Sequence, residues 1–97
     1  MSSFAIFVTV TLKPGTGDHF RPHILKNAEA SQRDEPDCHL FKVMTDEDNP
    51  DIYYFYEVYS DAAALDHHRQ QPHFLKFREA TADMVLDRDV KRCTVLA

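Results

Sequence analysis

Two histidines, His68 and His73, are the residues of this chain best suited to proton transfer. An imidazole accepts or donates a proton near neutral pH, so an inward-facing histidine can act as base or acid. It can equally be a structural residue whose hydrogen bonds are satisfied. At about 100° per helical residue, His68 shares the side of Leu65 and should face inward, whereas His67 should face solvent. His73 falls at the edge of the next helix's apolar face.

Polar side chains also fall on the apolar side of an earlier helical pattern. Asn27 lies between Phe20 and Ile24 on that side, Ser31 lies there too, and His23 flanks it. An amide donates and accepts hydrogen bonds, so Asn27 could hold a carbonyl or hydroxyl of a ligand. The alternative is that Asn27 bonds backbone at a strand end. Ser31 could simply be a small residue where helix meets sheet.

Glu57 is the one charged residue in the strongly β-forming segment 52–59, where it alternates with aromatic residues. A carboxylate in such surroundings needs a partner or has a raised pKa. It could orient His68 by accepting an imidazole proton. It could instead form a structural ion pair with a basic residue such as Arg92.

Metal and cofactor signatures are weak. His19 and His23 have the i, i+4 spacing of helical zinc ligands, but no carboxylate or cysteine pair at ligand spacing completes them. Cys38 and Cys93 form no CxxC motif, and two isolated cysteines predict no disulfide framework. Phosphate-binding glycine loops and dinucleotide fingerprints are also missing from the sequence. We therefore predict neither a metal nor a cofactor.

The segments that must position these residues alternate between strand and helix periodicity. Strands are expected at residues 4–12, 39–45, 52–59 and 91–96, and helices at residues 18–34, 61–70 and 72–86. The order βαββααβ predicts an α+β, ferredoxin-like domain spanning residues 1–97, with helices on one sheet face. The other face carries aromatic residues, including Tyr54 and Tyr56. An uncovered apolar face predicts a homodimer packed sheet to sheet.

Length and charge limit the possible partners. A chain of 97 residues fits one domain, and its formal net charge of -5 argues against nucleic acid, which needs clustered Lys and Arg. The longest apolar run is too short to span a membrane, and no secretory signal is visible at the start. We expect a cytoplasmic protein whose partners are a small-molecule substrate and a second copy of the chain.

Several of these residues occur together in a familiar order. They are Lys13-Pro14-Gly15, Phe20, Asn27, Ser31, Glu35-Pro36, Tyr56-Glu57-Val58-Tyr59, Ala64-Leu65, His68 and Pro72-His73-Phe74. In order and spacing the chain resembles the antibiotic biosynthesis monooxygenase (ABM) domain family over roughly residues 4–96. One departure is Asp37, where the family usually has Gly; Asp tolerates the left-handed conformation that Gly would supply.

The resemblance implies a dimeric α/β barrel with a pocket between each sheet and its helices. It implies a quinol or polyphenol monooxygenase that uses oxygen without flavin, haem or metal. One branch of the family instead isomerises the phosphorylated autoinducer-2 signal. That branch also has an Asn, a Tyr-Glu-x-x-Tyr segment and a His-x-x-x-Pro-His segment, the last seen here as residues 68–73.

The two activities share a first step, in which an enol or phenol loses a proton. His68 or His73 would be the base, Asn27 and Tyr59 would hold oxygen atoms, and Glu57 would tune the histidine. The isomerase also needs a phosphate clamp. Its candidates are Lys26, Arg69, Lys76 and Arg78, none with the spacing of a phosphate site. A third hypothesis, a binding dimer without turnover, gains if side chains fill the space between Asn27 and His68.

Overall fold

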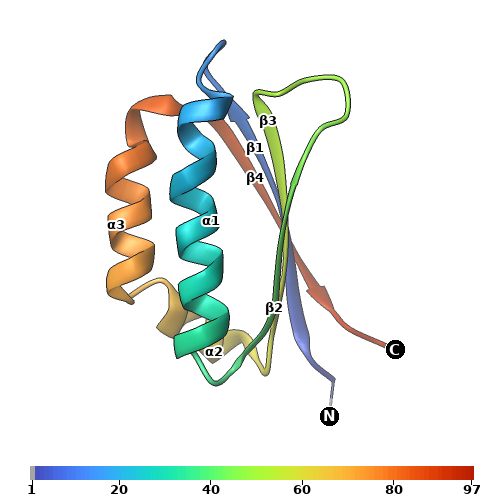
Figure 1. The fold of residues 1–97 in the computed structure, drawn as a ribbon. Helices are drawn as coiled ribbons and strands as arrows, with labels where there is room; N and C mark the ends of the chain where they lie inside the picture. The colour runs from blue at the N-terminus through green and yellow to red at the C-terminus, as the bar shows by residue number, and fades with distance from the viewer. Residues whose placement is uncertain (1) are drawn as a thin grey trace.

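A four-stranded antiparallel sheet covered on one face by helices forms the molecule. The computed structural model describes residues 2–97 (Figure 1). Its elements are β1 (Phe4–Leu12), α1 (Gly17–Asp34), β2 (Cys38–Thr45), β3 (Ile52–Tyr59), α2 (Ala62–His68), α3 (Pro72–Thr81), the 3-10 turn η1 (Ala82–Met84) and β4 (Val85–Thr94). The strands lie in the order β2-β3-β1-β4. The predicted ferredoxin-like βαββααβ fold is thereby confirmed.

Alternation along the two central strands divides the sheet into a helix-facing side and an open side. Val8 of β1 lies opposite Phe55 of β3, and both are buried beneath the helices together with Phe20 of α1. The open side carries Phe7 and Tyr54, whose rings stack with centroids 5.9 Å apart. Period-two patterning therefore places alternate residues of one strand in different surroundings.

The beginning of α1 is tied to the loop between β2 and β3. The Asp51 carboxylate accepts the backbone N–H groups of Gly15 and Gly17, each at 2.9 Å. Gly15 has a positive φ of 83°, and a Cβ on Gly17 would lie 2.0 Å from the carbonyl oxygen of Pro50. Glycine is thus required at both positions, for backbone conformation at one and for close approach at the other.

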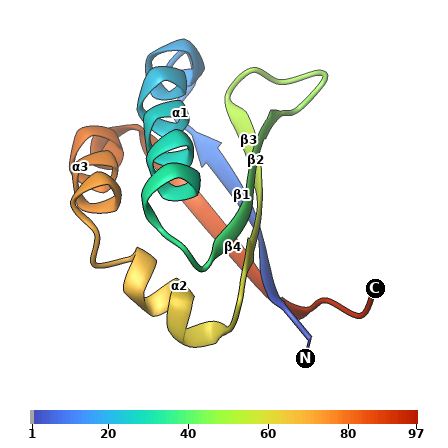
Figure 2. The ribbon, with the colours of Figure 1, turned by 60° about the horizontal axis from the view of Figure 1, so that its bottom comes forward.

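Helix α2 is a short connection across one end of the molecule, between β3 and α3 (Figure 2). Asp61 caps it by accepting the N–H of Ala64 at 2.9 Å, a usual role for Asp at a helix start. Pro72 occupies the first turn of α3, where its missing N–H costs nothing. His68 therefore ends α2, and His73 begins α3 five positions later.

The last helix and strand differ from the prediction. A helix over 72–86 and a strand over 91–96 were expected, but α3 ends at Thr81, and β4 starts at Val85, opposite Leu12 of β1. Charged residues occupy both faces of β4, so its sequence hides the period-two pattern. Backbone pairing with β1 over its whole length, rather than side-chain alternation, determines where this strand begins.

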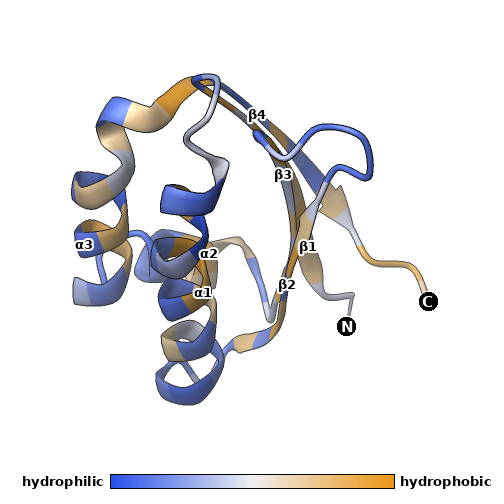
Figure 3. Cartoon of the chain, turned by 45° about the horizontal axis from the view of Figure 1, so that its top comes forward, coloured by the Kyte–Doolittle hydropathy of each residue, from blue (hydrophilic) through white to orange (hydrophobic). Residues whose placement is uncertain are grey.

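Polar surface gathers in the β2–β3 loop and on the outer side of the helices (Figure 3). Within residues 2–97, no helix is both long enough and apolar enough to cross a membrane.

Candidate functional site

His68 lies at the centre of a buried polar cluster beneath the helices. Its side chain is 2% exposed and shares a face of α2 with Leu65, while the adjacent His67 is exposed. This is the arrangement that helical phase predicts. The ring of Phe74 meets the His68 ring edge-on at 5.1 Å between centroids. Aromatic packing fixes the imidazole plane and directs its two nitrogens to different partners.

Glu35 holds both histidines from the end of α1. Its Oε2 lies 2.8 Å from Nδ1 of His68 and 2.5 Å from Nε2 of His73, and the carboxylate is buried. In the sequence, Glu35-Pro36 served only as part of the family resemblance, and Glu35 was not assigned to the site. The only local sign in the sequence is an acidic residue at the end of a helix. That sign does not show that the fold buries Glu35 beside α2 and α3.

Glu57 lies on the other side of His68. Its Oε1 is 4.0 Å from Nε2 of His68, beyond hydrogen-bonding distance, and accepts the hydroxyl of Tyr59 at 2.6 Å. Burial raises the pKa of Glu57 to about 7, against the opposing effects of Tyr59, Arg88 and Arg69. The carboxylate that orients His68 is therefore Glu35, and Glu57 faces the free nitrogen across a gap.

These contacts define the protonation state of His68. Burial lowers the pKa of its imidazole, which the hydrogen bond to Glu35 opposes. The neutral ring donates Nδ1–H to Glu35 and leaves the lone pair of Nε2 directed toward Glu57. A base oriented by a carboxylate is the arrangement needed for taking a proton from a bound hydroxyl.

Asn27 and Ser31 border the cluster from α1. The Ser31 hydroxyl donates to the backbone oxygen of Asn27 at 2.7 Å and lies 3.4 Å from Nδ1 of His68. Asn27 is 2% exposed, and its side-chain oxygen has no hydrogen-bond partner among residues 2–97. An unsatisfied buried amide next to a cavity is suited to a ligand hydroxyl or carbonyl. Tyr59, predicted to hold a substrate oxygen, is instead occupied with Glu57.

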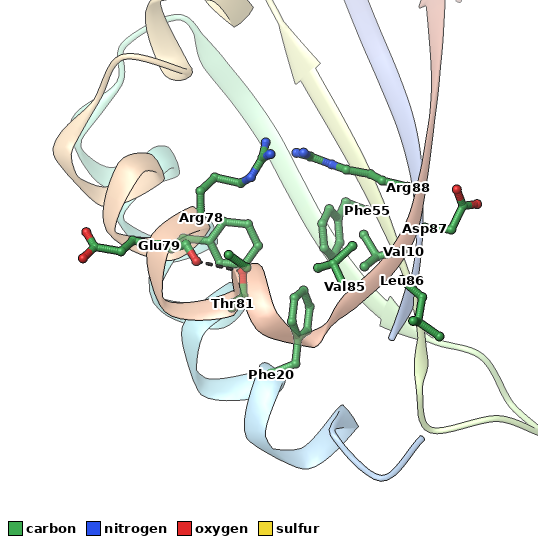
Figure 4. A pocket seen from close by; sticks show the side chains of 12 residues that line it. Val10, Phe20, Phe55, Arg78, Glu79, Thr81, Val85, Leu86, Asp87 and Arg88 are labelled. Atoms are coloured by element: carbon green, nitrogen blue, oxygen red, sulfur yellow. Dashed lines mark hydrogen bonds between the residues drawn. The ribbon is translucent and has the colours of Figure 1, made fainter. Parts of the chain in front are cut away.

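Two neighbouring cavities lie beneath the helices, and the inner one adjoins this cluster. The inner one, about 20 Å³, is lined by Asn27, Glu57 and His68 and has room for about one water. The outer one, about 600 Å³, lies between α3 and β4 (Figure 4). Phe55, Phe77 and Arg88 line both cavities. A ligand ring fits the outer cavity, and only a small group such as a hydroxyl fits beside His68.

Comparison with known proteins identifies the family of the chain. The family model described as antibiotic biosynthesis monooxygenase matches residues 3–80. The chain belongs to the ABM family. A crystal structure from Bacteroides thetaiotaomicron, named for the same family, has a TM-score of 0.92 and 25% identity, covering 98% of this chain and 90% of that chain. The family resemblance inferred from the sequence is confirmed.

Two longer proteins match this ABM chain over part of their length. A Lactobacillus acidophilus structure named as a monooxygenase is 30% identical with a TM-score of 0.89; 96% of this chain matches 46% of that chain. The uncharacterized protein sll1783 of Synechocystis is 38% identical over 53 residues, which are 55% of this chain and 36% of that protein. The chain thus spans about half of the Lactobacillus chain and about a third of the Synechocystis protein.

His23 lies away from His68. It lines a separate groove of about 330 Å³ between α1 and α3, with Lys26, His73 and Lys76. Asn27 lines both this groove and the inner cavity. The predicted site residues therefore divide into a central group around His68 and an outer group that contains His23.

Glu35, His68 and His73 are the residues best placed to hold a metal ion. Each offers one ligand atom, and the three atoms lie within 4.8 Å of one another. Imidazole and carboxylate together suit zinc or iron. The present contacts of 2.5 and 2.8 Å are hydrogen-bond lengths. Metal–ligand bonds of about 2.0–2.2 Å would need these atoms a few tenths of an ångström further apart.

Proposed function

We propose that this ABM protein is a cofactor-independent monooxygenase that acts on a small quinol or polyphenol-type aromatic. The observation that supports it most is the free Nε2 of His68, held by Glu35 and directed into a cavity that admits a hydroxyl. The family match and the neighbours named as monooxygenases support the general activity. The aromatic substrate class is our inference from the cavity's lining.

In this proposal the ring lies against Phe55 and Phe77 in the outer cavity, with one hydroxyl in the inner cavity. His68 takes the hydroxyl proton through Nε2, and Asn27 accepts or donates a hydrogen bond to a substrate oxygen. The phenolate gives one electron to oxygen, and the radical pair combines at a ring carbon. Water then leaves, so one oxygen atom enters the ring and a quinol plus oxygen becomes a hydroxyquinone plus water.

Glu57 completes the proton path in this scheme. With a pKa near 7 it exchanges protons close to neutral pH, and it faces the nitrogen that receives the substrate proton. His73 shares Glu35 with His68 and thereby helps to hold the carboxylate in place. We assign His68 as the base and His73 as a positioning residue.

Oxygen uptake with hydroquinones tests the proposal, using His68→Asn and the matched variant His67→Asn on the adjacent exposed position. General base catalysis contributes about 10²–10⁴-fold, so His68→Asn should lose at least about 100-fold in kcat and His67→Asn almost nothing. Equal activity of the two variants would refute the assignment. Conversion of an enol substrate under nitrogen would identify the isomerase alternative. Saturable binding without turnover would identify the binding dimer.

We also propose that the open sheet face forms a homodimer. Tyr56 and Val58 are only half-buried there, next to the stacked Phe7 and Tyr54. Covering apolar area of this kind is a usual reason for association. Sedimentation analysis should show a dimer that Tyr56→Glu dissociates, whereas Glu47→Gln, at an exposed position of the β2–β3 loop, leaves it intact. The cytoplasmic location rests on the sequence alone and stays a prediction.

A further inference from the structure

Three arginines from different parts of the chain line the two neighbouring cavities. Arg69 follows the end of α2, Arg78 belongs to α3, and Arg88 belongs to β4. Arg69 and Arg88 line the inner cavity, and Arg78 and Arg88 line the outer one. Figure 4 shows the guanidinium groups of Arg78 and Arg88 directed toward each other across the outer cavity. Arg88 therefore connects the wide space to the cluster around His68.

These guanidinium groups lack acidic partners. Over residues 2–97, none of the three forms an ion pair or donates a side-chain hydrogen bond to another residue. Glu79 and Asp87 also line the outer cavity, but both point away from Arg78 and Arg88 (Figure 4). Unpaired cations that face one another repel, so this arrangement costs stability unless an anion binds between them.

Burial makes that repulsion stronger. The pKa of Arg88 is lowered to about 10, first by burial and then by Arg78 and Arg69, and the group remains cationic at neutral pH. Glu57 is the acidic group nearest the inner side, but its own pKa near 7 leaves it only partly ionised. The cavities therefore gather positive charge in a protein whose formal net charge is -5.

The apolar lining continues from the arginines. Phe55, Phe77 and Val85 line the outer cavity, and the Arg78 guanidinium lies 5.7 Å from the ring centre of Phe74. An apolar wall, guanidinium groups lining both cavities and a base in the inner one fit a small ring that carries both an acidic group and a hydroxyl.

We propose that Arg88 and Arg78, assisted by Arg69, bind an oxyanion of the substrate, so that the substrate is a small hydroxylated aromatic acid or phosphate ester rather than a neutral quinol. This rests on the proposed function, since it concerns the ligand of the same site. The planar guanidinium forms paired hydrogen bonds with a carboxylate or a phosphate alike. The anion would orient the ring so that its hydroxyl enters the space beside His68.

Calorimetric titration under nitrogen tests the inference without turnover. The probes are 2,5-dihydroxybenzoate and hydroquinone, which share the reactive ring and differ by one carboxylate. Hydrogen bonds to a charged group are stronger than neutral ones, so the acid should bind at least about tenfold more tightly than hydroquinone. Its affinity should fall with added salt, while that of hydroquinone stays constant.

Arg88→Gln should bring the affinity for the acid close to that for hydroquinone. Arg88→Lys, which keeps the charge and loses the planar fork, should fall in between. Arg92→Gln is the matched control, because Arg92 lies on the same strand but packs over the Phe4 ring, 4.8 Å from its centre. Arg92→Gln should bind the acid as the unaltered protein does. Comparing phenyl phosphate with benzoate then shows which oxyanion the site prefers.

Equal affinities for 2,5-dihydroxybenzoate and hydroquinone in the unaltered protein would overturn the inference. So would an equal loss of affinity in Arg88→Gln and Arg92→Gln. The proposed activity fails separately: if neither compound supports oxygen uptake in air, the monooxygenase assignment is refuted while a measured preference for the acid stands. Rapid turnover of hydroquinone without any preference for the acid refutes only the anion site.

Discussion

Replacing Glu57 by Gln tests the central electrostatic argument about the site. Glu57 is 4% exposed, and Tyr59 donates a hydrogen bond to it at 2.6 Å. Burial raises the pKa of the carboxyl from an ordinary 4.5 to about 7. Gln keeps the shape of the side chain and can still accept the Tyr59 hydroxyl, but it carries no charge at any pH.

The sign of the effect follows from proton binding. Between pH 4.5 and about 7 the folded protein retains a proton on Glu57 that the unfolded chain has released. The free energy of unfolding must therefore fall as the pH rises through this window. At 1.36 kcal/mol per pKa unit, the fall due to Glu57 is about 3 kcal/mol and is complete above pH 7. Glu57→Gln should match the unaltered protein near pH 4.5 and exceed its stability by about 3 kcal/mol at pH 8.

Urea denaturation followed by circular dichroism at several pH values measures this difference, since the chain has no tryptophan to report by fluorescence. His68 contributes in the opposite direction: burial lowers its pKa, so stability due to His68 is lost as the pH falls through its ordinary range. Both proteins share that contribution, which largely cancels in the comparison. Glu47→Gln, at an exposed loop position, should change little at any pH. Parallel curves for Glu57→Gln and the unaltered protein would refute the reasoning.

Three further predictions follow from the same contacts. Glu35→Gln removes the negative charge that strengthens the hydrogen bonds from both histidines to one carboxylate oxygen. The kcat should therefore fall at least about 100-fold and Tm by about 10 °C, measured by oxygen uptake and calorimetry; normal turnover would contradict the assigned orientation of His68. Asn27→Leu removes an unsatisfied buried oxygen, so stability should hold or rise by about 1 kcal/mol while KM increases; loss of stability with unchanged KM would show that Asn27 is purely structural. Gly17→Ala should lower the free energy of unfolding, measured in urea, by more than about 2 kcal/mol, because its Cβ would meet backbone atoms. Gly15→Ala should lower it by about 1 kcal/mol, because its surroundings are open but its φ is positive. The reverse order would contradict the packing described for the start of α1.

Much of the fold is encoded locally and could be predicted. The alternation in residues 4–12 and 52–59 and the helical spacing of Phe20 and Ile24 gave elements within a residue or two of β1, β3 and α1. The predicted start of β4 was wrong because charged residues on both of its faces conceal the period-two pattern. Its start depends on pairing with β1, which is a property of the folded sheet rather than of residues 85–94.

The site divides in the same way, into residues that local patterns predict and residues that only long-range contacts bring in. The inward direction of His68 follows from helical phase alone, and so does that of Asn27. Glu35 joins the site because the end of α1 is brought against α2 and α3, and no local pattern reports that contact. Arg88 was missed because the last strand was expected to begin at residue 91, whereas β4 begins at Val85. Long-range contacts of this kind decide which polar residues share a cavity.

The charges on β4 have a consequence for self-association. With the strand order β2-β3-β1-β4, this strand is an edge of the sheet whose outer backbone groups have no neighbouring strand in the chain. Another copy adding there would bring the alternating run Asp87, Arg88, Asp89 and Lys91 against its own duplicate. Natural sheets use such charged edges to prevent ribbon-like growth. The run that concealed β4 in the sequence therefore discourages open-ended edge-to-edge polymers and leaves the broad aromatic face for association.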